Sequence, residues 1–335
     1  MTDPGDRGGG PNGRESPDLS KLTERLDFDA LAAANRRDTW FLMLGFFALL
    51  AIISVTVSTV LQAGLIGVIV ALAFSGGSSF VGYSQSDTLA IKSTGAVPAS
   101  PTEYGQLHNI VEALSIASGI PKPRVYVVHD ESPNAFATGK NPENAAVAAT
   151  TGLLEKMNRD ELEGVMAHEL AHIRNLDIRV MTVAVATAGT IAIIVDLFWR
   201  LLYFGGGRGR GRNDDNNPLA IVGLVVVAVL APIAAAMLKA AVSRRREALA
   251  DATAVAITRY PAGLRMALEK LDADRTVVRR TSHATSHLWI ETPDEHRSGV
   301  KGKRFNDMFD THPPLSKRIN TLRAIEGLPP YQGPA

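Results

Sequence analysis

The pattern His168-Glu169-Leu170-Ala171-His172 places two imidazoles and one carboxylate within five residues. Two histidines four residues apart lie on the same face of a helix, close enough to share one metal ion at about 2.0–2.1 Å from each nitrogen. The glutamate between them then lies beside the ion, where it can accept a proton from an attacking water molecule. These residue types at this spacing indicate metal-assisted hydrolysis.

The chemistry requires a helix at this position, and the alternative interpretation is an amphipathic helix with two incidental histidines. Asn158 followed by Glu161 is a capping-box signature, which predicts a helix that runs to about Asn175 and contains both histidines. The pattern therefore fits the H-E-x-x-H arrangement of zinc peptidases.

Two imidazoles are too few for a catalytic zinc site, which usually has three protein ligands and one open position. The metzincin extension would place glycine at position 175 and histidine at position 178, but the chain has Asn175 and Ile178 there. The third ligand must therefore come from another part of the chain.

Long apolar segments surround this motif. Residues 39–86 carry no formal charge, and one helical membrane pass needs about 20 apolar residues, so we predict two spans at 41–61 and about 64–83. Apolar segments at 180–204 and 219–238 predict a second hairpin, in which Asp196 and Arg200 can pair on one helix face. Four spans return the chain to the side on which it starts.

This layout suggests the third ligand. Spans of similar length end at similar depth, so residues just past 240 are expected near 172–178, and Glu247 and Asp251 stand there, four apart on one helix face. We predict Glu247 as the third ligand and Asp251 as an acceptor that orients a ligand histidine. The alternative is that Asp251 is the ligand and Glu247 pairs with neighbouring arginines.

The remaining segments have a mixed α and β character. Helical spacing of apolar residues predicts a helix over 103–118, and short β-branched runs predict strands at 125–128 and 145–150. The absence of cysteine excludes disulfides, iron–sulfur clusters and thiolate zinc sites, and a net charge of +1 gives no reason to expect nucleic acid as a partner. The predicted organisation is a disordered cytoplasmic tail (1–35), a transmembrane hairpin (36–87), a catalytic part with the H-E-x-x-H helix (88–177), a second hairpin (178–242) and a C-terminal catalytic part with the third ligand (243–335).

The chain resembles the HtpX-type integral membrane zinc metalloproteases, a family that also includes the CAAX prenyl endopeptidases. The resemblance covers residues 36–325 approximately, and its matching segments are PRVYVVHDESPNAFATG (123–139), NRDELEGVMAHELAHIRNLD (158–177), SRRREALADATA (243–254), TSHLWI (285–290) and THPP with Arg318 beyond it (311–318). One departure is Ala248, where many relatives have an aromatic residue. The resemblance implies an α+β, mainly helical fold, with four transmembrane helices and a zincin-like metalloprotease domain that holds a small β-sheet.

The resemblance also implies roles for single residues. The family's zinc ligands fall on His168, His172 and Glu247, its general base on Glu169, and the aspartate of its E-x-x-x-D pattern on Asp251. The family's other functional positions, one substrate-binding asparagine and two oxyanion-stabilising side chains, fall on Asn134, His312 and Arg318. Considered without the family, His312 could equally be a turn residue and Arg318 a solvated helix charge.

The predicted activity is hydrolysis of peptide bonds with one Zn²⁺ per chain. An extended polypeptide would add a strand beside the segment that begins with Ala145, Ala146, Val147 and Ala148. The resemblance implies quality control of misfolded or damaged membrane proteins in a bacterial-type cell membrane, often under stress. A processing protease with a defined peptide substrate, as in the prenyl endopeptidases, and a non-catalytic zinc-binding membrane scaffold are the alternatives, although a scaffold has no need of Glu169.

The orientation follows from the basic residues. Those at 36–37 and 244–246 indicate that both termini and the catalytic parts are cytoplasmic. Arg208, Arg210 and Arg212, between the third and fourth spans, argue for the opposite orientation.

Overall fold

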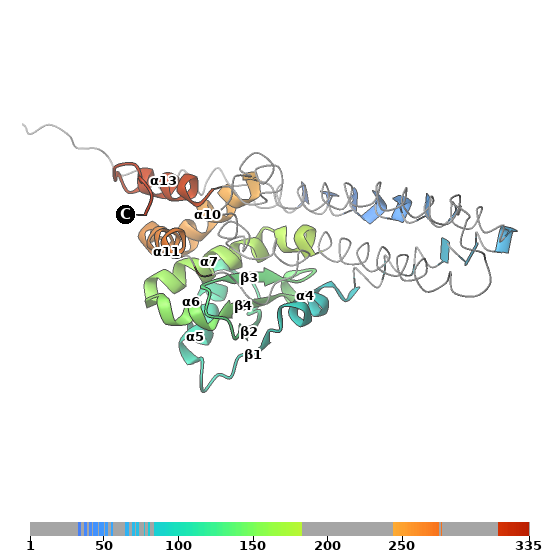
Figure 1. The fold of residues 1–335 in the computed structure, drawn as a ribbon, viewed down its shortest axis with the longest axis horizontal. Coiled ribbons are helices and arrows are strands. Elements are labelled where there is room, and N and C mark those ends of the chain that lie inside the picture. The colour runs from blue at the N-terminus through green and yellow to red at the C-terminus, as the bar shows by residue number, and fades with distance from the viewer. Residues whose placement is uncertain are drawn as a thin grey trace, which may run out of the picture.

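The computed structural model describes residues 84–182, 244–274, 276 and 314–334, together with scattered helical positions between 33 and 80. Figure 1 shows a globular part built from helices and a small sheet, from which the described N-terminal positions extend as a long projection. The described residues are mainly helical and contain one mixed sheet, as the sequence predicts.

The sheet has four strands in the order β1-β2-β4-β3: β1 (Val97–Pro98), β2 (Arg124–Val128), β4 (Ala146–Thr150) and β3 (Ala135–Thr138). Strand β2 runs parallel to β4, and the other two pairs are antiparallel. The strands predicted at 125–128 and 145–150 correspond to β2 and β4. β1 and β3 were not predicted, because β1 has two residues and β3 (AFAT) lacks a β-branched run.

Helix α7 (Arg159–Arg174) carries the H-E-x-x-H pattern and begins at the predicted capping box. The Asn158 side chain accepts a hydrogen bond from the backbone N–H of Glu161 at 3.0 Å, and the Glu161 carboxylate accepts one from the backbone N–H of Asn158 at 2.8 Å. Both bonds satisfy N–H groups that the first turn of a helix leaves without partners. The predicted helix is therefore confirmed, with its start set by this cap.

Helix α7 is also the centre of the packing. It contacts α5 (Gly105–Ser118), α10 (Arg244–Thr258), α11 (Pro261–Ala273) and strand β3. A Cβ atom on Gly164 would lie 2.4 Å from the backbone nitrogen of Leu264, so α7 and α11 meet backbone to backbone. Helix α13 (Leu315–Ile325) packs in turn on α11, and α4 (Ser86–Thr94) and α6 (Thr151–Lys156) are further helices of this globular part (Figure 1).

The described residues include only part of the predicted spans. Within the described residues, no helix combines the length and the apolar character that crossing a bilayer requires. Residues 183–243, which include most of the predicted third and fourth spans with Asp196 and Arg200, lie outside the described residues, as do most of the predicted tail and the segment 277–313.

Candidate metal centre

Three buried side chains from two helices converge at the C-terminal half of α7. The Nε2 atoms of His168 and His172 are 3.2 Å apart. From α10, the two carboxylate oxygens of Glu247 lie 3.6 Å from them, Oε2 from Nε2 of His168 and Oε1 from Nε2 of His172. Each residue is at most 4% exposed. The two histidines and the glutamate predicted from sequence therefore lie together, and their donor atoms form one compact group.

The separations of these donor atoms agree closely with those around a tetrahedral zinc ion. Donors about 2.0–2.2 Å from one tetrahedral ion are about 3.3–3.6 Å from each other. The observed separations of 3.2 and 3.6 Å match this range. Two imidazoles and one carboxylate are also the donor set of hydrolytic zinc sites. The residues present therefore fit a divalent ion such as zinc.

Glu169 lies on α7 between the two histidines in sequence and is 3% exposed. Burial is the largest influence on its carboxyl group and raises its pKa, and the neighbouring His168 and His172 counteract this only in part. A carboxyl group with a raised pKa in a buried polar cluster is suited to accept and return a proton.

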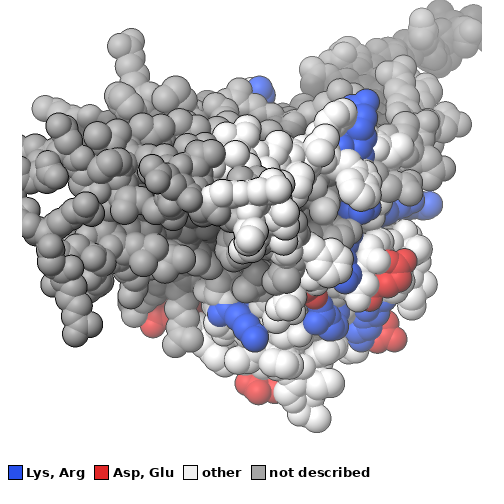
Figure 2. All heavy atoms as spheres, turned by 90° about the vertical axis from the view of Figure 1, so that its right-hand side faces the viewer, with Lys and Arg blue, Asp and Glu red and all other residues white. Residues whose placement is uncertain are grey.

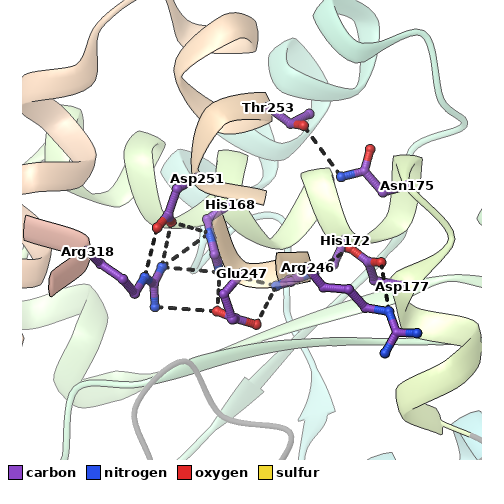
Figure 3. Close-up of polar contacts among 9 residues, drawn as sticks. All are labelled: His168, His172, Asn175, Asp177, Arg246, Glu247, Asp251, Thr253 and Arg318. Atoms are coloured by element: carbon purple, nitrogen blue, oxygen red, sulfur yellow. Dashed lines mark hydrogen bonds and ion pairs between the residues drawn. The ribbon is translucent and has the colours of Figure 1, made fainter. Parts of the chain in front are cut away.

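Each histidine is held at its other ring nitrogen by a carboxylate. Oδ1 of Asp251, one helical turn after Glu247 on α10, lies 3.0 Å from Nδ1 of His168. Oδ2 of Asp177 lies 3.1 Å from Nδ1 of His172. Such contacts fix the tautomer and the ring orientation, leaving Nε2 for the metal (Figure 3).

Sequence reasoning missed Asp177, which is fully buried. Helix α7 ends at Arg174, and Leu176 then adopts the left-handed backbone conformation, with φ of 59°. A leucine is rarely found there, because its Cβ crowds the backbone. The turn brings Asp177 back to His172 at a separation of five residues, which no regular helical spacing would have suggested.

Arg318 approaches the site from α13. It donates two hydrogen bonds to Asp251, from Nε to Oδ2 at 3.0 Å and from Nη2 to Oδ1 at 2.7 Å, and its Nη1 lies 3.6 Å from Oε2 of Glu247 (Figure 3). Burial favours the neutral form of Asp251, but the positive charge of Arg318 and the contact with His168 outweigh it and lower the pKa of Asp251 to about 2. Arg318 is 4% exposed, so its alternative interpretation as a solvated helix charge is wrong.

The predicted position of the substrate beside β4 is wrong. Strand β4 pairs with β2 on one side and with β3 on the other, so a peptide cannot add a strand beside Ala145, Ala146, Val147 and Ala148. The prediction failed because β3, which pairs with β4 on the side opposite β2, was not predicted from the sequence. In the described part of the sheet β3 is one of the two edge strands, with β1 at the opposite edge, and β3 also contacts α7.

Two further residues were predicted to contact the substrate or the oxyanion. Asn134 immediately precedes β3 and is 1% exposed, and its side-chain oxygen accepts a hydrogen bond from the backbone N–H of Ala135 at 3.0 Å. Its predicted contact with substrate stays a prediction. His312 lies outside the described residues.

Comparison with known proteins gives a consistent result. Residues 101–326 match the model of peptidase family M48. A protein named Protease HtpX homolog from Thermoanaerobacter pseudethanolicus is 43% identical over 298 residues, which are 88% of this chain and 97% of that protein. Another with the same name, from Streptococcus gordonii, is 45% identical over 297 residues, which are 88% and 98% of the two chains.

A weaker likeness connects the chain to the crystal structure of S. mikatae Ste24p, with 18% identity, a TM-score of 0.44, and coverage of 90% of this chain and 67% of that one. The family match and the two relatives extend over the α7 motif and the α10 segment that together supply the candidate ligands. The chain therefore belongs to peptidase family M48, among proteases of the HtpX type.

Proposed function

We propose that the protein is a membrane-bound zinc metalloendopeptidase that hydrolyses peptide bonds of misfolded or damaged membrane proteins. The observation that carries the proposal is the group formed by His168, His172 and Glu247, with the buried carboxylate of Glu169 on the same helix. A purely structural zinc site usually has a fourth protein ligand and has no need of a base. The group accordingly supports catalysis better than a scaffold.

The chain's own residues would divide the chemistry between them. A bound zinc ion would polarise the scissile carbonyl and acidify the attacking water. Glu169 accepts the proton of that water and then returns it to the leaving amine. Asp251 and Asp177 hold the two imidazoles in place, so that the donor atoms need not reorganise during the reaction.

Stabilisation of the developing oxyanion is proposed for Arg318 and His312. Two nitrogens of Arg318 are engaged by Asp251. Its third, Nη1, is buried and makes no hydrogen bond within the described residues, so it is the donor available for this role. A cationic donor aimed at the position where charge develops lowers the barrier more than one that binds the ground state.

The substrate is proposed to bind as an extended strand along β3. The edge position of β3 and its contact with α7 support this, because a strand there would pass close to the helix that bears the ligands. Main-chain hydrogen bonds would supply affinity with little dependence on sequence. Weak sequence preference is what a protease of unfolded chains requires.

The membrane location is proposed from the N-terminal projection. Its described apolar side chains are unusually exposed for a protein in water, with Trp40 63%, Leu65 76% and Ile66 77% accessible. In the view from its tip, a group of uncharged residues lies near the centre, and the visible Lys, Arg, Asp and Glu side chains lie mainly to the right of it and below it (Figure 2). Lipid around this projection would cover the apolar surface, and we retain four spans with both termini in the cytoplasm as part of the proposal.

One experiment tests the catalytic proposal. The protein is purified in detergent with a chelator, zinc is added back, and degradation of casein is followed for the wild type and for Glu169→Gln. We expect the variant to retain zinc and to lose at least about a hundredfold in turnover, because the proton acceptor is gone. Substantial proteolysis by the zinc-loaded variant would contradict the role of Glu169, and many fragments rather than one cut would favour quality control over processing of a defined peptide.

A further inference from the structure

Arg246 immediately precedes the ligand Glu247 in the first turn of α10, and its side chain is 13% exposed. It lies between two carboxylates. Its Nη2 donates a hydrogen bond to Oδ2 of Asp38 at 2.8 Å, and its Nε forms an ion pair with Oδ1 of Asp177 at 3.7 Å. Figure 3 shows Arg246 beside Asp177 on the His172 side of the centre. The first turn of α10 thus supplies a ligand and a cation to the same centre.

Arg246 can influence the candidate metal centre because its partner Asp177 also contacts His172. Asp177 is fully buried, and the oxygen that does not face Arg246 lies 3.1 Å from Nδ1 of His172. A buried carboxylate is costly unless a positive charge or several hydrogen bonds stabilise its ionised form. The contact between this carboxylate and Nδ1 of His172 leaves Nε2 free for a metal, and the ion pair with Arg246 holds the carboxylate in that position. Arg246 therefore acts on His172 through Asp177.

The other end of this chain of contacts is the N-terminal segment. Asp38 is the last charged residue before the uncharged stretch 39–86. Its side chain is 37% exposed and also lies 3.7 Å from Arg37. The Arg37 side chain is 69% exposed, so this second ion pair contributes little to holding Asp38 in place. The contacts from Asp38 through Arg246 and Asp177 to His172 connect the beginning of the apolar segment to the metal centre.

The far end of the same stretch provides a matched contrast. Asp87 accepts a hydrogen bond from Nη2 of Arg124 at 2.8 Å. Arg124 also donates to the backbone carbonyl of Asn144. Within the described residues, neither Asp87 nor Asn144 is a candidate ligand or is hydrogen-bonded to one. Both ends of the uncharged stretch are therefore bonded to the globular part. Among the residues that the structure describes, the Asp38 end is bonded to Arg246, which contacts the aspartate that holds His172, whereas the Asp87 end makes no such connection.

We propose that Arg246 is a positioning residue of the metal centre, and that Asp38 orients it, so that docking of the N-terminal apolar segment increases metal affinity at His172. The proposal rests on the proposed function, because it assumes that the group of His168, His172 and Glu247 holds a metal ion.

The test measures zinc affinity of the full chain in detergent by competition with a chromophoric chelator, together with the visible spectrum of the Co²⁺-loaded protein. Loss of a partner that orients a ligand typically lowers metal affinity about 10–100-fold. We expect Arg246→Gln to lower zinc affinity by about tenfold and Asp38→Asn by about threefold, since Asp38 acts one contact farther away. Arg246→Lys, which keeps the charge, should lie between wild type and Arg246→Gln.

Two controls separate positioning from a general loss of structure. Asp87→Asn removes the ion pair at the other end of the stretch and should leave zinc affinity and the Co²⁺ spectrum unchanged. In a double-mutant cycle, Asp38→Asn should have no further effect when Arg246 is already glutamine, because its influence passes through that residue. The unfolding midpoint of the zinc-free proteins shows whether any variant is simply unfolded, and if Arg246→Gln is, Arg246→Lys and Asp38→Asn carry the test.

The outcomes are distinct. Wild-type zinc affinity in Arg246→Gln or Arg246→Lys, equal losses in Asp38→Asn and Asp87→Asn, or additive effects of Asp38→Asn and Arg246→Gln would each overturn this inference while leaving the protease in place. A wild-type chain that binds no zinc would overturn the metal centre and the inference with it.

Discussion

The two histidines of the candidate metal centre are held by the same types of residue, but the contacts around His168 are shorter and more numerous than those around His172. On one side His168 is held by Asp251, and Asp251 by two hydrogen bonds from Arg318, at 2.7 and 3.0 Å. On the other side His172 is held by Asp177, which has Arg246 at 3.7 Å, and Arg246 continues to the partly exposed Asp38. Both halves are built as histidine, aspartate and arginine in series.

The difference separates a rigid half from an adjustable one. Planar guanidinium and carboxylate groups joined by two bonds, inside the protein, have little freedom to rearrange. The longer ion pair between Asp177 and Arg246, whose other partner Asp38 is partly exposed, can respond to what happens at Asp38. The His168 half is therefore expected to determine stability, and the His172 half to determine how the N-terminal segment influences the metal.

Removal of the ligand that both halves share should have the largest effect. Glu247→Ala deletes one of three donors, and we expect zinc affinity to fall by about a thousandfold, because the donors together provide the whole binding free energy. Metal content after dialysis against a chelator measures this. Retention of stoichiometric zinc by this variant would show that another residue is the third ligand.

Arg318→Ala should be the most destabilising change in the rigid half. It leaves the ionised Asp251 buried without its cation, and loss of one partner of a buried pair costs about 3–5 kcal/mol of the free energy of unfolding. Unfolding of the zinc-free protein in detergent, followed by intrinsic fluorescence, provides the measurement. Arg323→Ala, on the same helix but paired with Glu269 and 20% exposed, is the control and should cost less than about 1 kcal/mol.

The two aspartates allow a direct comparison of the halves. Asp251→Asn and Asp177→Asn should each lower zinc affinity by about 10–100-fold, because each histidine loses its charged acceptor. They should differ in stability: Asp251→Asn leaves Arg318 buried beside a neutral amide, whereas Asp177→Asn leaves Arg246 still bonded to Asp38. Equal unfolding midpoints of the two zinc-free variants would remove the distinction between a rigid and an adjustable half.

The smallest effect is expected at the ion pair farthest from this chemistry. Arg124 has a side chain that is 48% exposed, so Arg124→Gln should change the free energy of unfolding by less than about 1 kcal/mol and leave zinc affinity at the wild-type value. A chelator competition assay together with thermal unfolding tests both statements. A marked loss of zinc binding would mean that either end of the apolar stretch influences the centre.

The α7 motif was accessible from sequence because its geometry is local. A capping box, helical spacing of two histidines and a glutamate between them place the donors on one face whatever the rest of the chain does. Glu247 and Asp251 could also be proposed, since their separation of four residues puts them on one face of α10. The predicted strand addition at Ala145 failed because strand order is not a local property, and β3 pairs with β4 and occupies the edge of the sheet beside it.

The residue types and their helical spacing thus sufficed to predict a divalent metal site, its three candidate ligands and a candidate base beside it, because each of these depends on contacts within one or two turns of a helix. The partners that hold the ligands were decided only when the chain folded. Asp177 reaches His172 through a left-handed leucine, Arg318 contacts His168 across 150 residues of sequence, and Asp38 pairs with Arg246 across 208 residues. Contacts over such separations follow from how helices pack, and no periodicity in the sequence records them.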